Sequence, residues 1–258
     1  MHDLHDLDAF EDALIEEFKA HPVLANAAGL PDEDFAALLL QRRFVSLAFT
    51  PSYDLAIDLL SDEAGLRIAR VILREEYPGG HGLTPSHRED MTQDMRRLGV
   101  SRPALAASRP TAKTQQVIRD TLELIADAGG HANADLRLLT ILRFWGEVLV
   151  SVEYGQLWER MAPQLTDDGR NRSRFYHPHH VHDAKTHSLA TVSLLSGSHS
   201  DRLATRVTEL LAQEESTDCF RELEERALRL KTAFYDQFLP AVAQPPSGVS
   251  RSEMELMQ

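Results

Sequence analysis

The apolar residues of this chain recur at intervals of three and four, the spacing of one face of an α-helix. In residues 7–20, for example, Phe10, Leu14 and Phe18 share such a face. The sequence shows neither the alternation of a half-buried strand nor a repeat of fixed period. The pattern predicts helices at residues 7–20, 32–49, 50–57, 61–77, 84–98, 113–127, 135–165, 177–195, 201–213 and 218–238.

Proline and glycine separate these segments, as in Pro78-Gly79-Gly80 and Thr166-Asp167-Asp168-Gly169, where a turn is expected. The order of elements predicts an all-α protein, a single-domain bundle of about eight to ten helices spanning residues 1–240. Residues 241–258 turn to Pro, Ser and Gln, which predicts a disordered tail.

Composition narrows the class of protein. The net charge of −13 disfavours binding to nucleic acid phosphates or to an anionic membrane surface. Cys219 is the only cysteine, so an internal disulfide is excluded and a reducing compartment is favoured. The sequence shows no secretory signal and no apolar run long enough to cross a membrane, which predicts a cytoplasmic protein.

Residues 177–187 contain five of the twelve histidines and one aspartate. Each helical residue advances about 100°, so His179, Asp183 and His187 would share one stripe, with His180 at its edge. Imidazole and carboxylate on one face suit iron, manganese or zinc. A solvated polar helix start would give the same pattern, so this tract needs support from elsewhere.

Four glutamates at energetically unfavourable positions support a metal site. Glu75 and Glu76 end an apolar helix, where the helix dipole disfavours them unless a cation is near, and His87 starts the next helix. Glu147 and Glu153 lie within an apolar stretch and are costly to bury unless paired or ligated. They are separated by 153 − 147 = 6 positions, roughly 240° of helix, so they cannot both face one site. One is a candidate ligand; the other would pair with an arginine or reach solvent.

Together these positions give six ligands, enough for two metal ions. Mixed nitrogen and oxygen donors favour iron or manganese, and the lack of ligating cysteines argues against structural zinc.

The segments Glu75 to Gly80, Ser86 to Glu89, Leu98-Gly99, Phe175-Tyr176 and His179-x3-Asp183 resemble the haem-oxygenase-like di-iron oxidase and oxygenase family. The resemblance spans roughly residues 35–195 and implies that family's helical bundle, which binds no haem at the di-iron site. The implied ligands are Glu76 (or Glu75), His87, Glu147, His179, Asp183 and His187. Glu147 is preferred to Glu153 because its distance from His179 (179 − 147 = 32) fits the family better than 179 − 153 = 26.

One departure from the family leaves alternatives open. The family pattern His-x3-Asp-x2-His puts a histidine where this chain has Thr186, and His187 comes one residue later. Either His179 or His180 could therefore be the first ligand. A π-bulge could absorb the extra residue, or the second metal position could have been lost.

The resemblance implies a non-haem enzyme that uses two Fe²⁺ ions, with manganese as a possible substitute, to activate O2. The resemblance implies a small substrate derived from an amino acid, an amine or a fatty acid, as in natural-product biosynthesis. It also allows an electron donor as a partner and a homodimer as the assembly. Arg143 could hold a substrate carboxylate or pair with Glu147. The candidate pocket residues are Tyr53, Asp54, Arg143, Phe144, Trp145 and Tyr154.

Other functions stay open at this point. Relatives of the same fold include metal-free oxidases and thiamin-degrading proteins, and Cys219 is the one candidate for a catalytic thiol. A metal-free helical protein that binds small molecules, with solvated histidines, is a further alternative.

Overall fold

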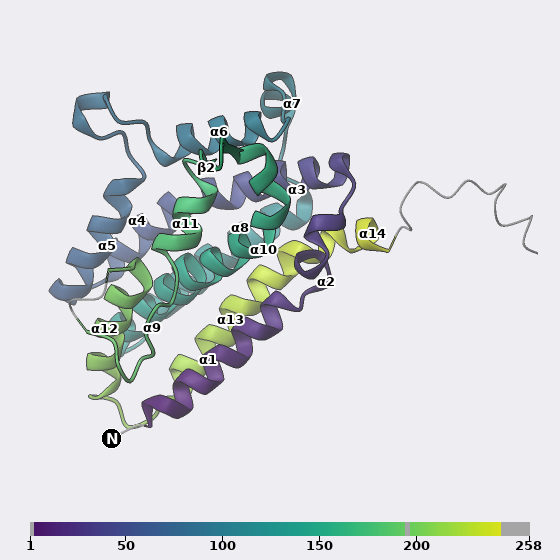
Figure 1. Cartoon of the computed structure of the whole chain (residues 1–258). Coiled ribbons are helices and arrows are strands. Elements are labelled where there is room, and N and C mark those ends of the chain that lie inside the picture. Colours follow the sequence, from purple (N-terminus) through teal and green to yellow (C-terminus); the bar gives the residue numbers. More distant parts are fainter. Residues whose placement is uncertain (1–2, 194–196, 244–258) are drawn as a thin grey trace, which may run out of the picture.

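The computed structural model describes residues 3–193 and 197–243, which form a bundle of helices (Figure 1). The prediction of an all-α fold is confirmed. The α-helices are α1 (Leu4–Lys19), α2 (Pro22–Ala25), α3 (Asp32–Leu47), α4 (Phe49–Leu59), α5 (Glu63–Glu75), α6 (His87–Arg97), α7 (Arg102–Ala107), α8 (Ala112–Gly129), α9 (Ala134–Ile141), α10 (Leu149–Leu165), α11 (Tyr176–His182), α12 (His199–Leu211), α13 (Asp218–Tyr235) and α14 (Leu239–Val242). Short 3-10 turns are η1 (Ala27–Gly29), η2 (Gly80–Gly82) and η4 (Asp236–Phe238), and η3 (Leu142–Val148) is a π-helix.

Side-chain caps explain where several helices begin. The Asp3 carboxylate accepts the backbone N–H of His5 and Asp6, so α1 starts a few residues before its apolar pattern. Ser86 and Glu89 form a capping box at the start of α6, which fixes the orientation of its first residue, His87.

The predicted long helix of residues 135–165 is present as the continuous run α9, η3 and α10. All seven residues of η3 are buried, because α12 and α13 pack against this segment while α11 packs against α10. Its π-helical turn is wider than an α-helical turn, and such turns are frequent at functional sites. The helix α1 lies beside α13 along one side of the bundle (Figure 1).

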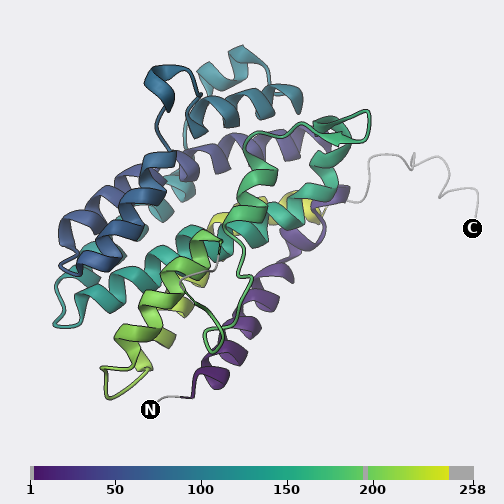
Figure 2. The same ribbon diagram turned by 60° about the vertical axis from the view of Figure 1, so that its left-hand side comes forward.

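The turn predicted at residues 166–169 is the tip of a small hairpin. Strands β1 (Thr166–Asp167) and β2 (Arg170–Asn171) pair antiparallel at the end of the bundle away from the N-terminus (Figures 1 and 2). The sequence shows no strand alternation here, so only the turn was predicted and the two short strands were not. Asp168 and Gly169 have φ of 48° and 70°, the left-handed values that an Asp-Gly hairpin turn requires.

Two further predictions concern the C-terminal tail and membrane-spanning helices. Helix α14 ends at Val242, and most of the predicted tail of residues 241–258 lies outside the described residues. Among the helices that are described, none combines the length and apolar character needed to cross a membrane.

Candidate metal centre

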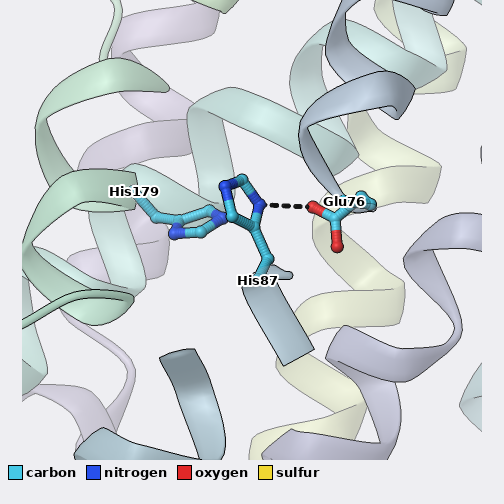
Figure 3. Close-up of side chains that lie close together, drawn as sticks. All are labelled: Glu76, His87 and His179. Atoms are coloured by element: carbon cyan, nitrogen blue, oxygen red, sulfur yellow. Dashed lines mark hydrogen bonds and ion pairs between the residues drawn. The ribbon is translucent and has the colours of Figure 1, made fainter. Parts of the chain in front are cut away.

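Three side chains from separate elements form a first potential metal-binding group, called group one. Glu76 is the C-cap of α5, His87 is the first residue of α6, and His179 lies on α11. His87 Nδ1 lies 2.9 Å from Glu76 Oε1, and the His87 and His179 rings are 4.7 Å apart between centroids (Figure 3). One ligand atom from each residue lies within 4.8 Å of the other two, so a single ion could contact all three.

The His179 ring is held in one tautomer. Its Nδ1 lies 2.7 Å from the carbonyl oxygen of Phe175, and because a carbonyl only accepts, Nδ1 carries the proton. Burial, with His87 close by, holds the pKa of His179 well below its usual range, so the ring is neutral. A neutral imidazole with a fixed tautomer and a free Nε2 lone pair is the state that a metal ligand requires.

The pair Glu76 and His87 accounts for the acidic end of α5. Burial would lower the pKa of His87, but its hydrogen bond to Glu76 and the charges of Glu76 and Glu75 outweigh burial and raise the pKa. The neighbouring acids therefore favour the protonated form of His87, which would offset the unfavourable interaction of these acids with the helix dipole.

Asp94 of α6 positions the helix that carries His179. Its buried carboxylate accepts hydrogen bonds from Ser173 Oγ at 2.7 Å and from the backbone N–H of Arg174 and Phe175 at 2.9 Å each. It thereby satisfies free N–H groups at the N-terminus of α11. Helix α6 thus provides one side chain of group one and orients another.

Glu147, Asp183 and His199 form a second potential metal-binding group, called group two, and all three are buried. Glu147 belongs to η3, Asp183 directly follows α11, and His199 is the first residue of α12. His199 Nδ1 lies 3.4 Å from Glu147 Oε2 and 3.3 Å from Asp183 Oδ1.

Group two concentrates negative charge in the interior. Burial and the neighbouring Glu147 raise the pKa of Asp183 well above its usual range. Burial would lower the pKa of His199, but hydrogen bonds to Asp183 and Glu147 outweigh it and raise the pKa to about 11. Two adjacent buried carboxyl groups are stabilised by a proton on one of them or by a nearby cation, and either a protonated histidine or a divalent ion can serve as that cation.

Tyr53 supports group two from α4. Its hydroxyl donates to Glu147 Oε1, and its ring stacks on Phe49 with centroids 4.3 Å apart. Burial and the Glu147 charge raise the pKa of Tyr53 well above 10, so the phenol stays a donor. A Cβ at Gly146 would lie 3.3 Å from the Tyr53 ring, so the glycine allows this close approach to η3.

Both groups line one cavity of about 190 Å³, called the metal cavity. Each group offers three donors of nitrogen and oxygen type, and their sharing of one cavity matches the arrangement of two-metal sites in helical bundles. The donor set therefore fits two ions. The six residues are Glu76, His87, His179, Glu147, Asp183 and His199.

The structure does not form the predicted stripe through His187. Helix α11 ends at His182, and the predicted helical continuation to residue 195 was wrong for residues 183–193, while 194–196 lie outside the described residues. The Asp201 carboxylate accepts the backbone N–H of Thr186 and His187 at 3.2 and 3.3 Å, and lies 2.7 Å from His187 Nδ1. These bonds replace helical ones and hold His187 outside both groups.

The three alternates also lie outside the two groups. His180 Nδ1 lies 3.0 Å from the carbonyl oxygen of Ser151, with its ring against Gly155. Glu75 Oε2 lies 3.4 Å from His199 Nε2, at the edge of group two. Glu153 faces away from the metal cavity, and Arg42 Nε donates to it at 2.8 Å.

The residues predicted to line the pocket lie in different places: some in the buried interior, one on the surface and two beside a small cavity. Arg143 is fully buried and bound to Glu11 and Glu224, so it contacts neither Glu147 nor the metal cavity. Asp54 is exposed, and Phe144 belongs to the hydrophobic core. Trp145 and Tyr154 line a smaller cavity that adjoins group one through Glu76 and His179.

Sequence reasoning missed His199, which lies 199 − 183 = 16 residues after Asp183. A signal was available: Ser198 caps α12 by accepting the N–H of Asp201, and His199 is followed at four-residue intervals by the buried Leu203 and Val207. The predicted helix start at residue 201 left His199 in a loop and concealed this buried face.

No protein-family model and no curated protein sequence matches this chain. Several solved structures are similar in fold, including a CADD-like protein and a TenA family regulator. A CADD-like protein of unknown function from Nostoc punctiforme has a TM-score of 0.61 and 10% identity, covering 93% of this chain and 100% of that chain. A TenA family transcription regulator from a Silicibacter species has a TM-score of 0.54 and 15% identity, covering 94% and 97%. Both are haem-oxygenase-like helical folds, so the predicted haem-oxygenase-like bundle is confirmed as a fold.

Proposed function

We propose that this protein is a non-haem di-iron oxidase or oxygenase that uses O2 to oxidise a small organic substrate. The observation that carries the proposal is that groups one and two, with three nitrogen and oxygen donors each, line the same cavity. The family resemblance of the sequence supports iron and O2, with manganese as the alternative ion. The two similar structures support the fold alone.

The chain's own residues prepare the centre in three ways. Phe175 fixes the tautomer of His179, and Tyr53 donates a hydrogen bond that orients Glu147. The buried positions of Glu147 and Asp183 limit access of bulk water. When bound, the two metal ions would supply the redox chemistry that these side chains lack.

Anaerobic loading with Fe²⁺ followed by metal analysis tests the proposal. We expect about two irons per chain, as a centre with six ligands in a helical bundle would bind. His199→Ala should reduce uptake to about one iron, because group two loses one of its three donors. His131→Ala is the control, because it changes an exposed histidine that belongs to neither group, and it should keep both irons.

The outcomes separate the alternatives. A protein that takes up no iron would leave a metal-free oxidase or a small-molecule-binding protein. Loss of iron in His187→Ala, with retention in His199→Ala, would favour the ligand set implied by the family pattern. The position of Cys219 does not support a thiamin-degrading activity in the metal cavity. Its thiol contacts Asn133 and does not line that cavity.

A further inference from the structure

A buried network around Glu153 contains more positive than negative groups. Arg42 Nε donates to Glu153 Oε1 at 2.8 Å, Lys231 Nζ lies 3.2 Å from the same oxygen, and Tyr235 donates to Oε2 at 2.8 Å. Burial opposes ionisation of Glu153, but Arg42 and Lys231 outweigh it and lower the pKa of this carboxyl. Two cations and one carboxylate give this network a net charge of 2 − 1 = +1, which is costly without an anion. Glu76, the acid that lines the adjoining cavity, is already paired with His87.

Unused hydrogen-bond donors accompany this charge. An ammonium has three N–H donors, and Glu153 is the one hydrogen-bond partner of Lys231 within residues 3–193 and 197–243. The indole Nε1 of Trp145 is buried and has no partner in the same described part. Lys231 Nζ lies 5.3 Å from the centre of the Trp145 ring, so these donors are neighbours.

Arg42, Lys231 and Trp145 line a cavity of about 30 Å³, called the inner cavity. Glu76 and His179 of group one also line it. A larger groove of about 410 Å³, called the outer groove, shares Glu76, Ser46 and Phe175 with the inner cavity. A volume of 30 Å³ accepts a small head group only, so the body of a ligand would lie in the outer groove.

We propose that the inner cavity binds the carboxylate of an organic acid through Arg42, Lys231 and Trp145. A carboxylate offers acceptors to the unused donors and compensates the extra positive charge. An alcohol offers an acceptor but no negative charge, and a protonated amine offers neither an acceptor nor a negative charge. The inference rests on the proposed function in one respect: it takes the bound acid to be the substrate oxidised at the metal centre.

Calorimetric titration of the full-length protein at pH 7, both metal-free and iron-loaded, tests this proposal with three ligands of equal chain length. Hexanoate should bind, while 1-hexanol and hexylamine should bind at least about tenfold more weakly, since charge-assisted hydrogen bonds are lost. Lys231→Met should lower the affinity for hexanoate about ten- to a hundredfold, because the charge-assisted hydrogen bond of the ammonium is lost. Lys113→Met changes an exposed lysine and should bind hexanoate as the unmodified protein does.

Trp145→Phe keeps an aromatic ring but removes the indole N–H together with the five-membered ring, and it should also weaken hexanoate binding. This second variant keeps the proposal testable if Lys231→Met does not fold. Equal affinity for hexanoate and hexanol, or no binding of hexanoate, overturns the proposal. Trapping of hexanal on Lys231 by borohydride, without hexanoate binding, also overturns it and assigns the amine a covalent role. If hexanoate binds but iron does not, the proposed function fails and the acid-binding cavity stands.

Discussion

Asp183 and His199 are 16 positions apart in sequence (199 − 183 = 16), yet Asp183 Oδ1 lies 3.3 Å from His199 Nδ1. The intervening segment returns to the bundle because Asp201 binds the backbone of Thr186 and His187. Group two therefore depends on a tertiary contact between a loop and a helix start.

Asp201→Asn should weaken that contact, because one carboxylate oxygen becomes an N–H donor facing other donors. Loss of the buried charge-assisted bonds should lower the free energy of unfolding by about 1–3 kcal/mol. It should also reduce iron bound at group two. Urea denaturation and metal analysis measure the two effects. Asp218→Asn, which changes an exposed acid in the first turn of α13, should leave both unchanged.

Tyr53→Phe removes the hydroxyl that donates to Glu147 and keeps the ring that stacks on Phe49. Loss of a bond that orients a metal ligand typically costs about 10–100-fold in metal affinity, and we expect that loss for one of the two irons. Competition with a chelator measures it. Tyr77→Phe is the control, since Tyr77 is exposed. Equal iron affinities in both variants would count against a supporting role for Tyr53.

Gly155→Ala should destabilise the protein without affecting metal. A Cβ at this position would lie 2.8 Å from Cε1 of His180, whose ring is held by the Ser151 carbonyl. The strain should cost about 1–3 kcal/mol in unfolding free energy. Gly29→Ala meets no atom within 4 Å and should change stability by less than about 0.5 kcal/mol. Loss of iron in Gly155→Ala would indicate that His180 does serve as a ligand.

Carboxylate binding should depend on pH through Lys231. Burial and the charge of Arg42 lower its pKa to about 8, against the opposing charge of Glu153. Below this pH the ammonium is charged and binds the acid; as pH rises through about 8 the free protein loses the charge and affinity for hexanoate falls. The buried Tyr154 and Tyr235, which also face the network, have pKa values raised by burial and stay neutral over this range. Titrations from pH 6 to 9.5 measure the decline, which Lys231→Met should lack.

The sequence predicted most of the fold because its helices carry regular apolar faces and clear capping residues. It also paired Glu76 with His87, since a short loop between two helix ends leaves these residues few places to lie. Glu147 and Glu153 were expected on different sides of one helix, and they face the metal cavity and the Arg42 network respectively. Their roles as ligand and non-ligand stay predictions.

The positions of His187, Arg143 and Lys231 could not be predicted, because they depend on tertiary contacts that helical spacing does not encode. A continued helix would place His187 on the stripe of His179, but the Asp201 carboxylate offers its backbone better partners. Arg143 looked available for a substrate because Glu11 and Glu224, its actual partners, are distant in sequence. The spare N–H donors of Lys231 and the unpartnered indole N–H of Trp145 could not be inferred without knowing which side chains surround them.

The origin of His199 in α12 has a consequence for recognising related chains. Asp183 and His199 belong to separate elements, and the entropy cost of closing the chain segment between two elements grows only slowly with its length. Insertions between His187 and Ser198 would therefore leave groups one and two intact. Chains with this arrangement will escape a search that demands the final histidine at a fixed distance from the aspartate, and a comparison of folded structures will find them.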